Sequence, residues 1–197
     1  MKRKTVRAGL ELAGALAFVI GSCYFLESSL SGTGWLSPYQ RGCTVWVPGC
    51  LAYLLALLPS SSERRKLTAI QLIGPLLNAG CMCCFTAGCA LSINAADESA
   101  ALEVAAQVNA WFVSGSVCVV LQSLFEAPGN IRTQPWAVVV SMSSTGCYLS
   151  AAVLGGYYSN HLVAGMCFWV VGSILATPIP IAALAERHHG SPSVDVK

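Results

Sequence analysis

Long stretches without charge constrain this chain more than any other feature of its sequence. No aspartate, glutamate, lysine or arginine occurs in residues 42–62, 67–96, 104–125 or 133–185. A bilayer core of about 30 Å is crossed by about 20 apolar helical residues, so the last stretch is long enough for two crossings. Lipid offers backbone groups no hydrogen-bonding partner, and the stretches lack the alternation of a strand, so helices are expected.

The low charge content also excludes a soluble helical bundle. Only 10% of the 197 residues are charged, and 55% are hydrophobic. A soluble domain usually has about 25% charged residues, and a bundle with so few would expose large apolar patches. The sequence therefore predicts an all-α, polytopic membrane protein that forms a single domain over residues 1–197, with a short basic N-terminal tail and a polar C-terminal tail.

Six transmembrane helices are predicted, and the distribution of basic residues agrees with that number. With six crossings both termini lie on one side, which then holds ten of the eleven lysines and arginines; only Arg41 falls on the other side. Basic residues resist translocation, so the side with the termini is expected to face the matrix, stroma or cytoplasm. The expected spans are Leu10–Ser29, Cys43–Leu58, Leu67–Ile93, Val104–Phe125, Trp136–Leu154 and Leu162–Leu184.

Each predicted helix contains a glycine followed by serine or cysteine. In five of the six, an aromatic residue lies three positions before the glycine; Ser143 stands there in the fifth helix. The first and second glycines of successive pairs are separated by 28, 27 and 26 residues, which predicts three helical hairpins over residues of approximately 8–60, 67–126 and 135–186. The glycines are Gly21, Gly49, Gly88, Gly115, Gly146 and Gly172.

A second division of the same six helices is also visible. Residues 18–26 read FVIGSCYFL and residues 112–120 read FVSGSVCVV. Two halves of three helices each would have opposite orientations, as in transporters built from inverted repeats. The regular glycine spacing favours the hairpins over this alternative.

The glycines are expected to pack helices together. Association in lipid has little hydrophobic driving force, so small residues that allow close backbone approach replace it. Intramembrane amides are expected to join helices through hydrogen bonds or, alternatively, to line a site for a neutral solute. These amides are Gln71, Asn78, Asn109 and Gln122.

The hairpins resemble the YrhK-type membrane domain, a family of small membrane proteins without an established activity. The resemblance rests on aromatic-x-x-Gly-[Ser/Cys] in both helices of a hairpin, with acidic and Gly-Trp elements between them. It implies a fold unit and no catalytic residue. The first hairpin carries it through Phe18, Gly21, Ser22, Phe25, Glu27, Gly34, Trp35, Trp46, Gly49 and Cys50. The second carries Phe85, Gly88, Phe112, Gly115 and Ser116, and the third Gly146, Trp169, Gly172, Ser173 and Pro178.

Metal, haem and catalytic chemistry find little support in the sequence. Nine of the ten cysteines lie inside predicted helices, with Cys43 at the loop boundary of the second, and inside a helix cysteine serves as a small buried apolar residue. Cys81 and Cys84 share a helical face, but two thiolates without a histidine make a poor zinc site. No histidine lies within a predicted span, which disfavours a haem with paired axial histidines. We therefore expect no metal, no cofactor and no catalytic residue, although a bound structural lipid is compatible with the sequence.

These observations favour a non-catalytic accessory subunit of a larger membrane assembly. Its expected partners are other membrane subunits and lipids, and not nucleic acid. A respiratory assembly of the mitochondrial inner membrane, with both termini in the matrix, is the leading expectation; a thylakoid or other cellular membrane is the alternative. The alternative function is a channel or transporter for a small neutral solute. That function predicts a polar cavity near the midplane that touches Pro48, Asn78, Asn109 or Gln122, whereas a dry, packed centre would exclude it.

Overall fold

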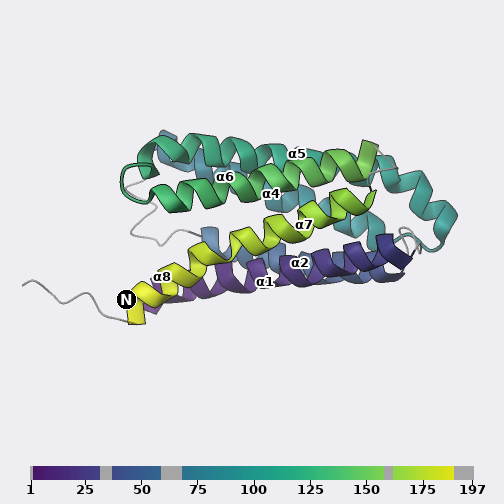
Figure 1. Cartoon of the computed structure of the whole chain (residues 1–197), viewed down its shortest axis with the longest axis horizontal. Coiled ribbons are helices and arrows are strands. Elements are labelled where there is room, and N and C mark those ends of the chain that lie inside the picture. The colour runs from purple at the N-terminus through teal and green to yellow at the C-terminus, as the bar shows by residue number, and fades with distance from the viewer. Residues whose placement is uncertain (1, 32–36, 59–67, 158–161, 189–197) are drawn as a thin grey trace, which may run out of the picture.

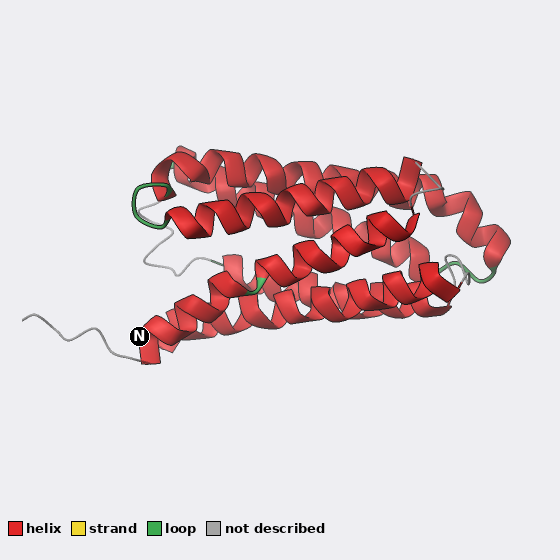
Figure 2. Cartoon of the chain, viewed as in Figure 1, coloured by secondary structure: helices red, strands yellow, loops and turns green. Residues whose placement is uncertain are grey.

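The computed structural model describes residues 2–31, 37–58, 68–157 and 162–188. Within these ranges the chain forms helices and no strand, as Figure 2 shows. The helices are α1 (Lys2–Ser31), α2 (Ser37–Leu57), α4 (Ala69–Ile93), α5 (Glu98–Asn130), α6 (Pro135–Tyr157), α7 (Leu162–Ala176) and α8 (Pro178–His188). The predicted all-helical class is therefore confirmed for the part of the chain that the structure describes.

Local residues explain where several helices begin. Thr68 caps α4 in a capping box, in which its hydroxyl accepts a bond from the Gln71 amide and the Gln71 side chain accepts from the Thr68 amide. Asp97 caps α5 by accepting a hydrogen bond of 2.9 Å from the backbone of Ala100. Both α6 and α8 begin with proline, which is favoured in the first turn because its fixed φ suits a helix and its missing N–H is not needed there.

Five stretches of the described helices are long and apolar enough to cross a membrane: Thr5–Ser31, Ile70–Ile93, Glu98–Asn130, Pro135–Gly155 and Leu162–Glu186. Helix α2 is not among them, because Gln40 and Arg41 lie in its early turns and shorten its uncharged part. The outer surfaces of the helices carry large apolar side chains, including Ile70 and Val139, which are 68% and 65% exposed. This surface is compatible with an integral membrane protein.

The last predicted span is not one continuous helix. The chain bends at Thr177, between the end of α7 and Pro178 at the start of α8. The hydroxyl of Thr177 donates to the carbonyl of Ile174 at 2.8 Å, which satisfies one of the backbone groups freed by the break. With 15 residues α7 is only about 22 Å long, so α7 and α8 together make up the span of 25 residues from Leu162 to Glu186. Thus Pro178 and Pro180 redirect this segment and do not terminate it.

The first six helices form a closed ring. Helix α1 packs along α2, α4 along α5 and α6 along α7; the ring is completed by contacts of α2 with α4, α5 with α6 and α7 with α1. Figure 1 shows the start of α1 and the end of α8 at the same end of the bundle. In the same view α7 and α8 run obliquely, from beside α6 to the N-terminal part of α1, on which α8 packs.

Candidate functional site

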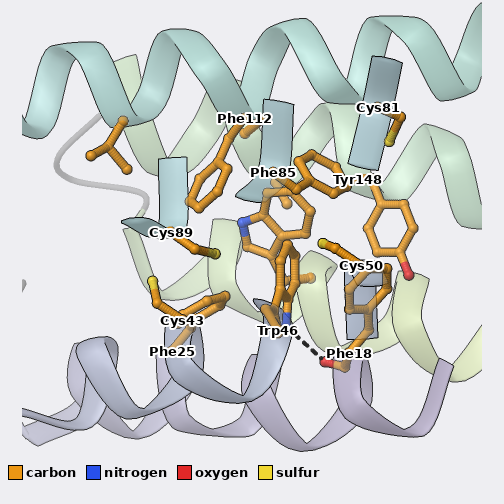
Figure 3. Packing of buried hydrophobic residues seen from close by; sticks show 14 of the residues in the cluster. Phe18, Phe25, Cys43, Trp46, Cys50, Cys81, Phe85, Cys89, Phe112 and Tyr148 are labelled. Carbon is orange, nitrogen blue, oxygen red and sulfur yellow. Dashed lines mark hydrogen bonds between the residues drawn. The ribbon is translucent and has the colours of Figure 1, made fainter. Parts of the chain in front are cut away.

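One aromatic side chain from each of the six ring helices lies at the centre of the bundle. Trp46 and Trp169 meet edge to face, with ring centroids 4.9 Å apart, and Phe85 lies 5.7 Å from Trp169. Aromatic pairs in this geometry are each worth about 0.5–1.5 kcal/mol beyond the burial of their area. We call this group the aromatic cluster, and Figure 3 shows most of it. Its members are Phe18, Trp46, Phe85, Phe112, Tyr148 and Trp169.

The aromatic cluster explains why α1 and α2 can approach so closely. A methyl group added at Gly21 would overlap the ring of Trp46, and one added at Gly49 would lie 3.1 Å from the ring of Phe18. Each aromatic residue therefore covers the glycine of the opposite helix, and not the glycine of its own. The Trp46 indole N–H also donates to the Phe18 carbonyl at 3.1 Å, as drawn in Figure 3.

The same exchange, in which each aromatic ring covers the glycine of the opposite helix, occurs between α4 and α5. A methyl group at Gly88 would lie 2.8 Å from the ring of Phe112, and one at Gly115 would lie 2.7 Å from the ring of Phe85. Between α6 and α7 only half of the exchange is present, because a methyl group at Gly172 would lie 3.0 Å from Tyr148. Five of the six glycines named from the sequence thus face a neighbouring helix at a distance that leaves no room for a side chain.

Gly146 differs from the other five and does not lie at a helix contact. It is exposed, and a methyl group there would meet nothing within 4 Å. Helix α6 presents Ser144 and Tyr148 to the interior, so Tyr148 supplies the ring that Ser143 could not. The prediction that Gly146 packs helices is therefore wrong, because α6 is rotated relative to the repeat.

Hydrogen bonds between helices come mainly from serines, which the sequence analysis did not single out for this role. A hydroxyl can bridge two helices only where the backbones are close, and for Ser22, Ser116 and Ser173 the preceding glycine allows that approach. The serine bonds between helices include Ser22 Oγ with Ser173 Oγ (3.1 Å), Ser123 Oγ with Ser141 Oγ (2.9 Å), Ser144 Oγ to Gly172 O (2.8 Å) and Ser116 Oγ to Tyr148 O (3.3 Å).

A cavity of about 310 Å³ lies between the aromatic cluster and the end of the bundle that carries the two described chain ends. Every described helix contributes to its lining. Its inner end is formed by buried Phe18, Cys81, Phe85 and Tyr148, so the aromatic cluster is its floor. Ser141, Ser144 and Thr145 of α6 and Ile179 and Pro180 of α8 belong to its wall. We call it the terminal cavity.

The outer part of the terminal cavity carries charged groups. The Arg7 guanidinium and the Glu11 carboxylate form an ion pair of 3.0 Å, and the Arg7 side chain is 57% exposed. Glu126 is exposed on the α5 side of the cavity and accepts a hydrogen bond of 3.1 Å from Gln122. Polarity therefore increases from the aromatic floor toward the outer end.

Two buried amide oxygens, on residues that line the terminal cavity, have no hydrogen-bond donor among the described residues. They are Oδ1 of Asn78 on α4 and Oε1 of Gln122 on α5. A buried acceptor that stays unpaired costs about 1–3 kcal/mol, so such atoms indicate a place that another molecule can fill. The terminal cavity is therefore our candidate site. It differs from the cavity predicted from the sequence, because the centre of the bundle is packed with aromatic rings and the cavity lies toward one end, with Asn78 and Gln122 but not Pro48 or Asn109 in its lining.

The two other amides named from the sequence lie elsewhere. Gln71 is exposed and bonds within the first turn of α4, so its role in this structure is capping and not a contact between helices. Asn109 is buried at 8% exposure but is not part of the cavity lining, and Pro48 is exposed on α2 outside it. Only Asn78 and Gln122 come together, on adjacent helices.

Buried cysteines pack beside the aromatic cluster. Cys43, Cys50, Cys81 and Cys89 are each fully buried, as Figure 3 shows, whereas Cys83 is exposed on the opposite face from Cys81. The described residues contain no group of three or more histidine, cysteine, aspartate or glutamate side chains arranged to hold a metal ion.

Sequence reasoning did not identify Arg7, Glu11, Glu126 or Ser141 as residues of the site. Charged and hydroxyl-bearing residues are common near helix ends, so nothing in the sequence marked these four as parts of a site. One signal was available: Glu126 follows Gln122 by four residues, which puts both on the same helical face.

The Gly34-Trp35 element of the suggested resemblance lies outside the described residues. Comparisons of this chain with protein-family models, with curated proteins and with solved structures found no match.

Proposed function

We propose that the chain crosses the membrane six times as three helical hairpins and admits a small polar solute into the terminal cavity, as a transporter or channel would. Helix α2 is the sixth crossing. Its partner α1 runs beside it, and the two share the glycine and aromatic contacts at Gly21 and Gly49. The same kind of glycine and aromatic contact recurs between α4 and α5. This recurrence supports three hairpins over two inverted halves of three helices each.

The observation that carries this proposal is the pair of unpartnered amide oxygens in a cavity lined by every described helix. Solute sites in helical membrane proteins lie between helices and combine apolar walls with a few polar groups that fix orientation. Asn78 and Gln122 supply such groups, and Phe18 and Phe85 supply the apolar floor.

The aromatic cluster closes the cavity toward the other end of the bundle. Trp46 is fully buried and touches rings from α1, α4, α5 and α7. A solute that enters beside Gln122 therefore stops at Phe18 and Phe85 in this conformation. In a transporter, passage would require these rings to separate, which corresponds to alternating access with one side open.

Cysteine labelling tests whether the terminal cavity admits water from one side only. Ser141 lines the cavity, and the adjacent Met142 is 37% exposed on the outside of α6. In a variant without other reactive cysteines, Ser141→Cys should react with a membrane-impermeant thiol reagent added on the side of the termini and not on the other. Met142→Cys is the matched control and should stay unreactive from both sides, because it faces lipid. An unreactive Ser141→Cys would refute the proposal.

Tags at the two ends of the chain test the number of crossings separately. Six crossings require both tags to be protected, or both accessible, in sealed vesicles of one orientation. Tags on opposite sides would exclude an even number of crossings and, with it, the role of α2.

A second candidate function, a non-catalytic subunit that packs in a larger membrane assembly, is favoured by the density of the aromatic cluster. A carrier would have to break contacts such as Trp46 with Trp169, whereas a static subunit would keep them. Native electrophoresis of solubilised membranes separates the two candidates, since a subunit would migrate with a large complex and a transporter as a small species.

A further inference from the structure

The charges of the terminal cavity indicate what kind of solute it holds. Three charged side chains line it: Arg7, Glu11 and Glu126. Arg7 and Glu11 neutralise each other across 3.0 Å. Glu126 has no basic partner among the described residues and accepts a bond only from the neutral Gln122 amide. The cavity therefore carries one uncompensated negative charge.

The uncharged lining also favours a ligand that donates hydrogen bonds and carries positive charge. Asn78 Oδ1 and Gln122 Oε1 both require donors. The faces of aromatic rings attract cations, and Phe18, Phe85 and Tyr148 form the floor. An ammonium group has three donors and no acceptor, so it matches amide oxygens and a carboxylate, which only accept.

We propose that the terminal cavity binds a small organic cation, a protonated amine, with Glu126 as its counter-ion and the Asn78 and Gln122 oxygens as its acceptors. This inference rests on the solute site proposed above and specifies its ligand. A volume of about 310 Å³ corresponds to about ten water molecules, so a ligand with a handful of heavy atoms fits.

Three probes of one size separate charge from other properties: 4-amino-1-butanol, 1,4-butanediol and 4-hydroxybutyrate. They are positive, neutral and negative at pH 7. The full chain in detergent is titrated with each probe, and thermal unfolding is followed by tryptophan fluorescence. Ligand at ten times its dissociation constant should raise Tm by about 3–6 °C. We expect the amine to reach half its maximal effect at a concentration at least about tenfold below that of the diol, and the acid to have no effect.

Two variants on α5 show whether Glu126 causes the preference for the amine over the diol. Glu126→Gln should abolish the preference for the amine and leave the response to the diol unchanged. Glu103→Gln is the matched control, because Glu103 is an exposed glutamate on the same helix and outside the cavity. It should retain the tenfold preference. Since Glu126 is itself exposed, its substitution is not expected to prevent folding.

The other outcomes overturn the inference in distinguishable ways. Equal responses to amine and diol would leave the solute site in place and remove its cation preference. A stronger response to the acid would show that basic residues govern the site. If no probe shifts the wild-type Tm, the amine inference fails. The Ser141→Cys labelling, which needs no ligand, then decides whether the solute site fails as well.

Discussion

Substituting alanine for each of two glycines of the repeat should have effects of opposite sign. The sequence treats Gly21 and Gly146 alike, since both precede a small residue near the middle of an apolar helix. In the structure a methyl group at Gly21 would overlap the Trp46 ring and lie 2.8 Å from the Gly42 carbonyl oxygen. At Gly146 it would meet nothing within 4 Å.

The expected magnitudes follow from packing and helix propensity. Forcing an extra methyl group into a packed interior costs about 1–3 kcal/mol, and Gly21 falls at the upper end because the buried Trp46 ring cannot move aside. Replacing glycine by alanine within a helix stabilises the folded state by up to about 1 kcal/mol, because alanine has the higher helix propensity. We therefore expect Gly21→Ala to lower the free energy of unfolding by about 2 kcal/mol and Gly146→Ala to raise it by up to about 1 kcal/mol. At about 2–4 °C per kcal/mol, the two Tm values should differ by about 6–12 °C.

The buried cysteines provide the assay. Cys43, Cys50 and Cys89 are fully buried and become reactive only on unfolding, so a thiol-reactive dye reports the transition in detergent. Cys83 and Cys167 are exposed and set the baseline. Equal Tm shifts for the two variants, or a loss at Gly146 as large as that at Gly21, would refute the rotation of α6 and the glycine contacts derived from it.

Three further predictions concern the core, the bonds between helices and the caps. Trp46→Ala should cost about 3–5 kcal/mol in the same assay, whereas Trp111→Ala, at a position 43% exposed, should change stability by about 0.5 kcal/mol or less. A double-mutant cycle of Ser22→Ala and Ser173→Ala should give a coupling of about 0.6 kcal/mol, and at most about 1.7 kcal/mol, for their bond of 3.1 Å. Zero coupling would show that the bond contributes nothing. Asp97→Ala should cost about 1 kcal/mol and speed amide hydrogen exchange in the first turn of α5; unchanged exchange would contradict the cap.

Much of the helical architecture could be predicted because it depends on local properties. The four uncharged stretches already required helices, and Thr68 and Asp97 mark helix starts that can be recognised in the sequence. The bend at Thr177 was less accessible, since prolines such as Pro178 both end helices and redirect them. A proline redirects the helix when the segment after it can pack on another helix. Here α8 packs on α1.

The candidate site was only partly accessible from the sequence. Asn78 and Gln122 stood out as polar residues within apolar stretches, but nothing local distinguished them from Gln71 or Asn109. Whether an amide side chain lines the cavity or lies elsewhere depends on the positions of the neighbouring helices. Asn78 on α4 and Gln122 on α5 both line the terminal cavity, whereas Gln71 lies at a helix end.

The sequence by itself determined that the chain is helical and apolar, and that glycine recurs with an aromatic residue one turn before it. Those properties depend on composition and on spacing along the chain. Only the tertiary structure decided that five of the six rings cover the glycine of the paired helix, that Gly146 faces outward and that a cavity lined by every described helix lies beside the aromatic cluster. These features depend on how each helix is rotated and tilted against its neighbours. Many small packing contacts between distant segments set those angles together, and no local pattern encodes them.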